Sequence, residues 1–270
     1  MVKESLILIE NLEIPSLHLD RVVRVDCYLP VNVASPDDLE LLLINDGQDL
    51  QKMNFESIMN KLYESGSIRP VLCVGIHCGV ERKMEYGTAS EADFKGRGAK
   101  AAKYTRFILE ELIPLVQETY HLPRIRQKSF AGFSLGGLSA LDIVWNHPQE
   151  FSLAAVFSGS LWWRSKDQYE EGYDDDSDRI MHQLIRKGAR QRGLKFFFEC
   201  GMLDEQKDRN QNGIIDSIDD TMDLIEELRD KGYSENDIEF LLLEDGKHDV
   251  ATWGRAFPVF LKWAFPKIGN

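Results

Sequence analysis

The sequence predicts an α/β fold in which a mostly parallel central sheet of about eight strands carries helices on both faces. Several short runs, such as residues 41–44 and 196–198, are continuously apolar, which is typical of strands covered on both faces. These runs alternate along the chain with segments of helical periodicity. Alternating strands and helices usually form a parallel sheet with helices packed on either side.

Eight runs rich in Val, Ile, Leu and Phe are bounded by turn residues, and each is expected to form a strand. A proline-containing turn should join the first two. The expected strands are residues 6–9, 21–29, 39–44, 70–77, 128–133, 153–158, 194–199 and 238–243.

Three segments between these runs show helical patterns. Residues 99–120 carry apolar side chains every three or four positions, and Pro114 predicts a kink or break there. Residues 138–146 and 220–231 are the other two, and Gly232 is expected to end the last of them. The acidic segment 167–178 is expected to be a loop. Because no repeat or linker interrupts the pattern, residues 1–270 are expected to form a single domain.

Composition excludes several classes of partner. The formal net charge is −13, which argues against a nucleic-acid backbone or an anionic membrane surface. No apolar run approaches the roughly 18 residues that a membrane span needs. The N-terminus lacks the basic start of a signal peptide, so a cytoplasmic location is expected. The four cysteines show no zinc-binding spacing and are expected to be reduced and structural.

A nucleophile motif lies in the middle of the chain. Residues 132–136 read Gly-Phe-Ser-Leu-Gly, which matches G-x-S-x-G. The motif is short, but an expected strand precedes it and an expected helix follows at once. A sharp turn at that junction exposes the serine hydroxyl, and the helix N-terminus adds partial positive charge where an oxyanion would form. Ser134 is therefore predicted as a catalytic nucleophile; the alternative is an ordinary helix-capping serine.

A serine hydroxyl needs a base, and a histidine titrates in the right range. Proteins with this kind of turn place their triad along the chain in the order serine, acid, histidine. His77 precedes the serine, whereas His248 follows the last expected strand. His248 is therefore predicted as the base. The acid should follow the strand at 194–199, where Asp204 is the best-placed carboxylate and Glu205 and Asp208 are competitors.

Together these residues resemble a known family. The chain is similar to the putative-esterase family, which includes enterochelin esterase-like hydrolases, feruloyl esterases, esterase D and the mycolyltransferases. The resemblance covers nearly the whole chain. It is carried by Asn45-Asp46-Gly47-Gln48, Arg82-Lys83-Met84-Glu85-Tyr86, Glu111-Leu112-Ile113-Pro114, the glycine-rich segment 132–137, Ser158-Gly159-Ser160-Leu161-Trp162-Trp163, Cys200-Gly201-Met202-Leu203-Asp204, and Gly246-Lys247-His248-Asp249 with Trp253.

The resemblance implies an α/β-hydrolase fold and a triad of Ser134, Asp204 and His248. It also implies an oxyanion hole made by the backbone N–H groups of Leu135 and Gln48, two donors aimed at the developing charge. One departure concerns the loop of the base. Related sequences often read Gly-Gly-His where this chain has Gly246-Lys247-His248, which puts a flexible cation beside the histidine.

Trp162 and Trp163 follow the strand at 153–158, at the sheet edge where catalytic groups are expected. They are predicted to form an aromatic wall of the substrate pocket. A packed core position is an equal alternative for one of the two.

A twelve-residue stretch from Asp208 to Asp219 fits an EF-hand-type calcium loop inserted within residues 205–220. Glycine stands at position six, and an expected helix follows. An Asp in place of the usual Glu at position twelve should weaken binding. A solvated Asn/Asp turn is the alternative. The predicted calcium ligands are Asp208, Asn210, Asn212, Ile214, Asp216 and Asp219.

These patterns predict a serine esterase that hydrolyses small acyl or aryl esters through an acyl-enzyme and needs no cofactor for its chemistry. The expected partner is a small-molecule ester. A siderophore trilactone esterase is a narrower alternative, although the sequence shows no obvious basic cluster near the site. An acyltransferase would also form an acyl-enzyme, and a binding module that has lost activity would keep the same fold.

Overall fold

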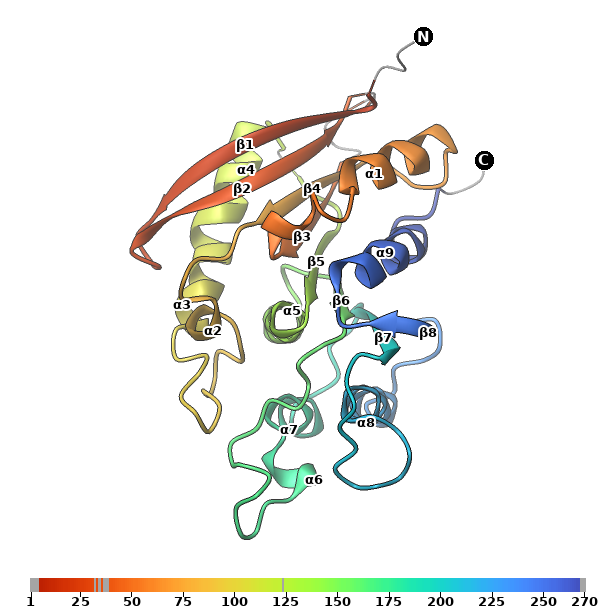
Figure 1. The fold of residues 1–270 in the computed structure, drawn as a ribbon. Coiled ribbons are helices and arrows are strands. Elements are labelled where there is room, and N and C mark those ends of the chain that lie inside the picture. The colour runs from red at the N-terminus through yellow and green to blue at the C-terminus, as the bar shows by residue number, and fades with distance from the viewer. Residues whose placement is uncertain (1–4, 32, 34, 36–38, 123, 268–270) are drawn as a thin grey trace.

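The computed structural model describes residues 5–31, 33, 35, 39–122 and 124–267. Within these residues it contains one eight-stranded sheet in the order β1-β2-β4-β3-β5-β6-β7-β8 (Figure 1). Only β2 runs against the other strands. The strands are β1 (Ile7–Ser16), β2 (Arg21–Pro30), β3 (Glu40–Asn45), β4 (Val71–Ile76), β5 (Lys128–Phe133), β6 (Leu153–Phe157), β7 (Lys195–Leu203) and β8 (Ile238–Lys247).

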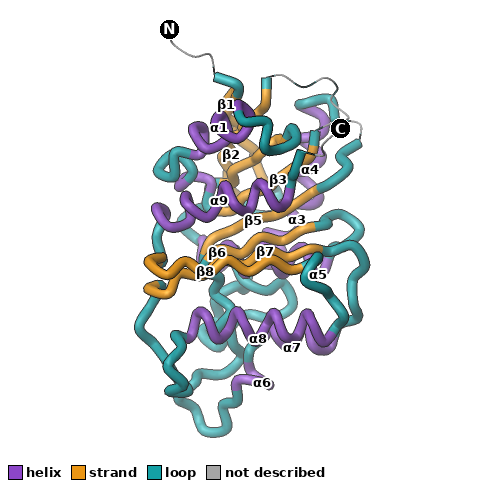
Figure 2. Tube along the Cα trace, turned by 90° about the vertical axis from the view of Figure 1, so that its right-hand side faces the viewer, coloured by secondary structure: helices purple, strands orange, loops and turns teal. Residues whose placement is uncertain are grey.

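Helices cover both faces of the sheet, and the helices are α1 (Phe55–Glu64), α2 (Arg82–Glu85), α3 (Ala101–Arg106), α4 (Ile113–Thr119), α5 (Leu135–Asn146), α6 (Asp175–Asp178), α7 (Ile180–Lys187), α8 (Asp216–Asp230) and α9 (Val250–Ala264). Side chains of β3 alternate between two cores. Leu41 and Leu43 pack with α3, α5, α7 and α8, whereas Leu42 and Ile44 pack with α1 and α9. Figure 2 shows α8 and α9 on opposite sides of β7 and β8. The predicted α/β architecture is therefore confirmed.

The first strand is longer than its sequence pattern predicts. The pattern places its end at residue 9, before a proline-containing turn, but β1 continues to Ser16 and Pro15 lies opposite Val22. Proline lacks a backbone N–H, and within sheets it is confined mainly to edge strands. Because β1 is the edge strand of this sheet, Pro15 fits without a lost bond to a further strand.

The helix does not break at Pro114 but changes its hydrogen-bonding pattern just before it. The segment 99–120 forms α3, then a π-helical stretch at Phe107–Leu112, and then α4, whose second residue is Pro114. A π-helical turn widens the hydrogen-bonding pattern, which suits a proline that cannot donate. The predicted loop at 167–178 contains the short helix α6 at its end. The helix predicted at 220–231 begins earlier, at Asp216, and is followed by Gly232 at φ 90°.

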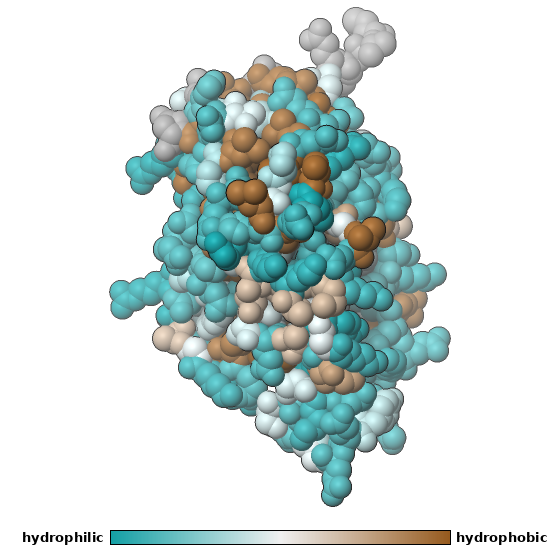
Figure 3. All heavy atoms as spheres, turned by 90° about the vertical axis from the view of Figure 1, so that its left-hand side faces the viewer, coloured by the Kyte–Doolittle hydropathy of each residue, from teal (hydrophilic) through white to brown (hydrophobic). Residues whose placement is uncertain are grey.

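Exposed apolar side chains are scattered over the surface. Figure 3 shows small apolar groups interspersed with hydrophilic ones on one face. The exposed apolar residues include Leu8, Leu17, Val22 and Val80. No helix of the described residues is both long and apolar enough to cross a bilayer. All four cysteines are free, as expected. The cytoplasmic location stays a prediction.

Candidate active site

Ser134 lies where the chain turns sharply from β5 into α5. Its backbone angles are φ 53° and ψ −121°, a combination that costs an L-residue free energy and persists only where its surroundings fix it. Its N–H donates to the Phe157 oxygen on β6 at 2.8 Å. Glycines make the turn sterically possible, because a Cβ atom on Gly132 would lie 2.2 Å from the Gly136 oxygen. The structure therefore contains the strained strand-to-helix turn that the motif predicts.

The two backbone donors expected for an oxyanion hole have no hydrogen-bond acceptor within the described part of the chain. Leu135 is the first residue of α5, a position whose N–H has no partner inside the helix. Gln48 lies in the 3₁₀ turn Gly47–Asp49 after β3. Among the described residues, neither N–H donates a hydrogen bond to another protein group. The Asn45 side chain donates to the Gly136 oxygen at 2.8 Å, so the turn after β3 and the start of α5 lie side by side.

Arg82 holds the turn that carries Gln48. Its guanidinium donates to both carboxylate oxygens of Asp46, at 2.7 and 2.6 Å, a bidentate geometry that fixes orientation. Asp46 itself has φ 60°. Gly47 has no space for a side chain, since a Cβ atom would lie 2.3 Å from the Gly75 carbonyl carbon. Arg82 belongs to one of the family motifs, but nothing in its local sequence indicates this contact.

Ser160 is a neighbour of the nucleophile that the sequence does not assign. Its hydroxyl oxygen lies 3.3 Å from the hydroxyl oxygen of Ser134. Its backbone N–H donates to the backbone carbonyl oxygen of Ser134 at 3.1 Å. Ser160 is buried and follows β6 by three residues. The sequence feature that could have pointed to Ser160 is its place just beyond the end of a parallel strand, because such strand ends meet at one edge of the sheet.

His248 lies in the bend between β8 and α9, and its side chain is exposed. Its ring packs edge-on against Trp253, with 5.4 Å between ring centroids. In the described residues, no hydrogen bond joins the His248 ring to Ser134 or to Asp204. Although the residue is exposed overall, the packing around its imidazole lowers the pKa of His248, and the Asp204 charge opposes this decrease. His77, the competitor, instead pairs with Asp26 at 2.7 Å.

Lys247, the departure from the family pattern, is a regular strand residue. It pairs with Leu203 of β7, its N–H donates to the Thr252 hydroxyl at 2.9 Å, and its side chain is exposed. A glycine is therefore not needed at this position, and the loop of the base closes with lysine there.

Asp204 follows β7 on a chain reversal close to β8. Both of its carboxylate oxygens are buried without a hydrogen-bond partner in the described residues. Burial raises the pKa of Asp204. The nearby Ser158 side chain and the His248 charge both act to lower this pKa. Its neighbourhood is tight, since a Cβ atom on Gly201 would lie 2.7 Å from its Oδ1 and 2.4 Å from the Gly246 carbonyl carbon. A buried carboxylate without a partner is costly, so the position calls for a donor such as the imidazole.

Glu199 is a second buried carboxyl group beside the acid. Burial raises its pKa to about 8, and the Asp204 charge adds to this, so Glu199 is mostly protonated at neutral pH. The Ser158 hydroxyl donates to it at 3.5 Å and accepts the Trp253 indole N–H at 3.0 Å. Glu199, Ser158 and Trp253 thus form a buried polar layer under Asp204 and His248. Nothing in the sequence distinguishes Glu199 from other strand residues.

The two tryptophans have different environments. Trp163 is fully buried, donates to the Thr88 hydroxyl at 3.1 Å and fills the space left by Gly87 and Gly98. It therefore takes the packed core position that is the alternative for one of the two tryptophans. Trp162 is half-buried and lines a cavity of about 270 Å³.

Comparison with known proteins identifies the family. A family model described as "Putative esterase" matches residues 16–264. The chain belongs to that family. The prediction of an esterase is thus confirmed at the level of the family. A search of the curated proteins finds no match.

Solved structures of similar fold include esterases and a siderophore hydrolase. The enterobactin esterase of Shigella flexneri in the presence of enterobactin is 20% identical, with a TM-score of 0.72 over 94% of this chain and 58% of that one. A ferulic acid esterase is 18% identical, with a TM-score of 0.70 over 96% and 97%. The siderophore hydrolase EstB of Aspergillus nidulans is 18% identical, with a TM-score of 0.66 over 99% and 98%. These likenesses confirm the α/β-hydrolase fold. The chain spans little more than half of the enterobactin esterase.

Polar groups of the predicted calcium loop form hydrogen bonds with one another. Asp208 accepts the N–H groups of Asn212 and Gly213 at 3.1 and 2.9 Å. The side-chain amides of Asn210 and Asn212 both donate to Asp219 at 2.8 Å, and the N–H of Ile214 donates to Asn212.

The remaining acid of that loop, Asp216, also bonds within the loop. Asp216 accepts the N–H of Arg209 at 2.7 Å and lies 3.5 Å from its guanidinium. Across the described chain, no group of three or more His, Cys, Asp or Glu side chains is placed to hold a metal ion. The calcium site therefore stays a prediction.

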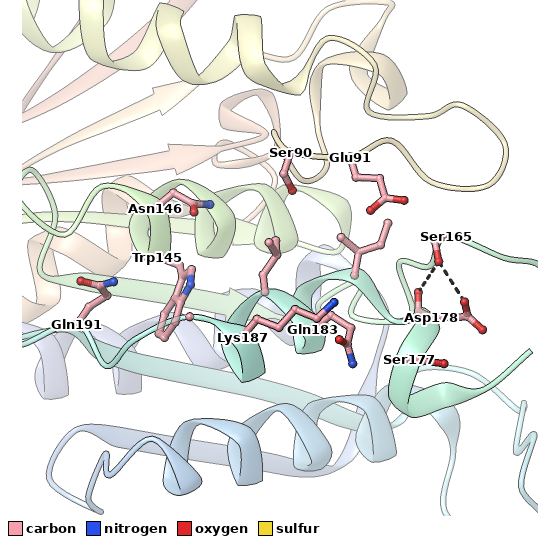
Figure 4. A pocket seen from close by; sticks show the side chains of 13 residues that line it. Ser90, Glu91, Trp145, Asn146, Ser165, Ser177, Asp178, Gln183, Lys187 and Gln191 are labelled. Carbon is pink, nitrogen blue, oxygen red and sulfur yellow. Dashed lines mark hydrogen bonds between the residues drawn. The ribbon is translucent and has the colours of Figure 1, made fainter.

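A separate cavity of about 470 Å³ lies beside the end of α5 and along α7 (Figure 4). Trp145, Asn146, Gln183 and Lys187 line it, together with Glu91 from the opposite loop. Its lining contains none of the predicted catalytic residues.

Proposed function

We propose that this chain hydrolyses carboxylic esters through an acyl-enzyme formed on Ser134. The observation that carries the proposal is the strained backbone of Ser134 at the start of α5, beside two free backbone N–H groups. A nucleophile held on such a turn projects from the sheet toward substrate. The free N–H groups of Leu135 and Gln48 would donate to the oxyanion, and donors of this kind often supply the largest catalytic term.

His248 would act as the base. Its lowered pKa keeps the imidazole neutral at neutral pH, so one ring nitrogen can accept the Ser134 proton as the hydroxyl oxygen attacks the ester carbonyl. The other nitrogen would donate to Asp204, whose buried oxygens lack a partner. This contact would stabilise the imidazolium.

The protonated His248 would then give its proton to the leaving alcohol as the ester bond breaks. A water molecule that loses a proton to the same histidine would attack the acyl-enzyme and release the acid. An alcohol in place of water gives acyl transfer, so product analysis with an added alcohol distinguishes the two outcomes.

Small acyl or aryl esters are the proposed substrates. A siderophore trilactone is a second candidate, and one observation favours it. Basic side chains that are scattered in the sequence gather at the cavity beside Trp162, namely Lys95, Arg97, Arg164 and Lys207. These basic side chains come from three separate segments of the chain, so the sequence shows no cluster of them.

Labelling with a fluorophosphonate tests the proposal and locates the nucleophile. We expect one label on Ser134, identified by mass spectrometry of the labelled peptide, and none in the Ser134→Ala variant. Ser160→Ala is the matched control, because its hydroxyl lies 3.3 Å away and its removal should leave labelling at Ser134. A label on Ser160 contradicts the assignment of Ser134 as the nucleophile. No label on the wild-type protein contradicts the proposal and would favour a non-catalytic binding module.

A further inference from the structure

Arg164 lines the cavity beside Trp162 and has no anionic partner among the described residues. It forms no ion pair with any carboxylate in the described part of the chain, and its Nε is buried without a hydrogen-bond partner. Three aromatic rings surround its guanidinium carbon, those of Phe94, Trp162 and Tyr173, at 5.6, 5.9 and 5.7 Å. Cation–π contacts of this kind offset part of the cost of desolvating the charge. They do not neutralise it.

The backbone on both sides holds Arg164 in place. Its carbonyl oxygen accepts the Phe94 N–H at 3.0 Å, and the residue forms a β-bridge with Arg179. These contacts fix the backbone of Arg164, and the three ring contacts hold its guanidinium, which reduces the entropy lost on binding a ligand.

Two of the segments that line the cavity are continuous with segments of the proposed catalytic site. Trp162 and Arg164 follow Ser160, whose hydroxyl lies 3.3 Å from that of Ser134. Glu205, which also lines the cavity, directly follows Asp204. Figure 1 shows these two segments and the loop before α3 on the same lower side of the molecule. At about 270 Å³, the cavity is below the usual range for a complete drug-sized ligand, so it would take one part of a substrate.

The charges around the cavity leave a positive excess. Arg97 is paired with Asp93 at 2.7 Å, and Asp216 is paired with Arg209. When these paired side chains are set aside, the positive side chains of the lining are Arg164, Lys95 and Lys207.

Glu205 is the opposing acid. Burial and the Asp216 charge raise its pKa. An anionic group would thus meet three cations that form no ion pair within the described part of the chain, and one carboxyl group.

We propose that Arg164 is a specificity-determining residue that binds a carboxylate on the substrate, so that the preferred esters carry a free carboxylate at the far end of the acyl chain. The planar guanidinium fork matches a carboxylate with two parallel hydrogen bonds, whereas a lysine is a point charge. This inference rests on the proposed ester hydrolysis at Ser134.

Mono-p-nitrophenyl esters of adipic and suberic acid, each compared with its neutral methyl ester, test the inference through kcat/KM. A charge-assisted contact of this kind is worth about 10- to 100-fold. The wild-type protein should prefer the free acids by about that factor. Arg164→Gln should lose the preference and still hydrolyse the neutral esters, and Arg164→Lys should retain part of it. Arg190→Gln is the matched control, because Arg190 is another arginine stacked on a tyrosine, 5.1 Å from the Tyr233 ring centre, and is not in the lining of this cavity.

Neutral esters separate the two possible failures. Hydrolysis of the neutral esters without preference for the free acids overturns the role of Arg164 and leaves the proposed function standing. A preference that persists in Arg164→Gln overturns it as well. No hydrolysis of either ester by the wild-type protein overturns both.

Discussion

Replacing Glu199 by glutamine should raise the free energy of unfolding by an amount that grows with pH. Glu199 is buried, and burial raises its pKa from the ordinary 4.5 to about 8, with the Asp204 charge adding to the effect. Ser158 and Arg255 act in the opposite direction. The folded protein therefore binds this proton more tightly than the unfolded chain does. A glutamine has the shape of the protonated side chain and cannot ionise.

The sign and size of the effect follow from linkage. The stability that proton binding gives the wild-type protein is fully present below about pH 4.5 and is lost as the pH rises to about 8. The loss amounts to about 1.4 kcal/mol per pH unit in that window. Between about pH 6 and about pH 9, the stability advantage of Glu199→Gln over the wild type should grow by about 3 kcal/mol.

Urea denaturation of both proteins at the two pH values measures this change, because other titrating groups contribute equally and cancel in the difference. Glu244→Gln is the control, since Glu244 is an exposed residue of β8. Its advantage over the wild type should stay constant. An advantage of Glu199→Gln that is the same at both pH values would show that Glu199 is already ionised at the lower pH, and the description of the buried layer would be wrong.

Three further predictions concern the base, the acid and the loop. The value of kcat/KM should fall as the pH drops through the pKa of His248, which burial places below 6.5; a pH profile with its acidic limb above that value contradicts this. Replacing Asp204 by Asn should lower kcat by up to about 10⁴-fold with an unchanged circular dichroism spectrum, and a loss of less than a few-fold would exclude Asp204 as the acid. Calcium should raise the Tm of the wild-type protein and not that of Asp208→Ala; equal Tm values in calcium chloride and in EDTA would exclude the calcium site.

Much of the fold could be predicted because the sheet is covered on both faces. An uninterrupted apolar run such as 41–44 is stable only between two layers, so the pattern indicates both the strand and its surroundings. The edge strand was harder to place. Its outer side bears fewer constraints, so charged residues and Pro15 are tolerated in it and obscure its length.

The nucleophile, base and acid could be proposed from sequence because each follows a strand end, and parallel strand ends meet at one edge. The cavity at Trp162 could not be predicted from the sequence. Its lining comes from three distant segments, around residues 94–97, 162–168 and 205–216, and no local pattern indicates that these will meet. Trp163 shows the same limitation, because its burial depends on the spaces at Gly87 and Gly98, far earlier in the chain.

Pre-steady-state hydrolysis of p-nitrophenyl acetate by the wild-type protein and by Ser134→Ala tests the central claim most directly. The wild-type protein should release a burst of p-nitrophenol stoichiometric with enzyme, as the acyl group transfers to the Ser134 oxygen. The variant should fold normally and show neither burst nor turnover. A folded Ser134→Ala protein that retains the burst would contradict the proposed acyl-enzyme.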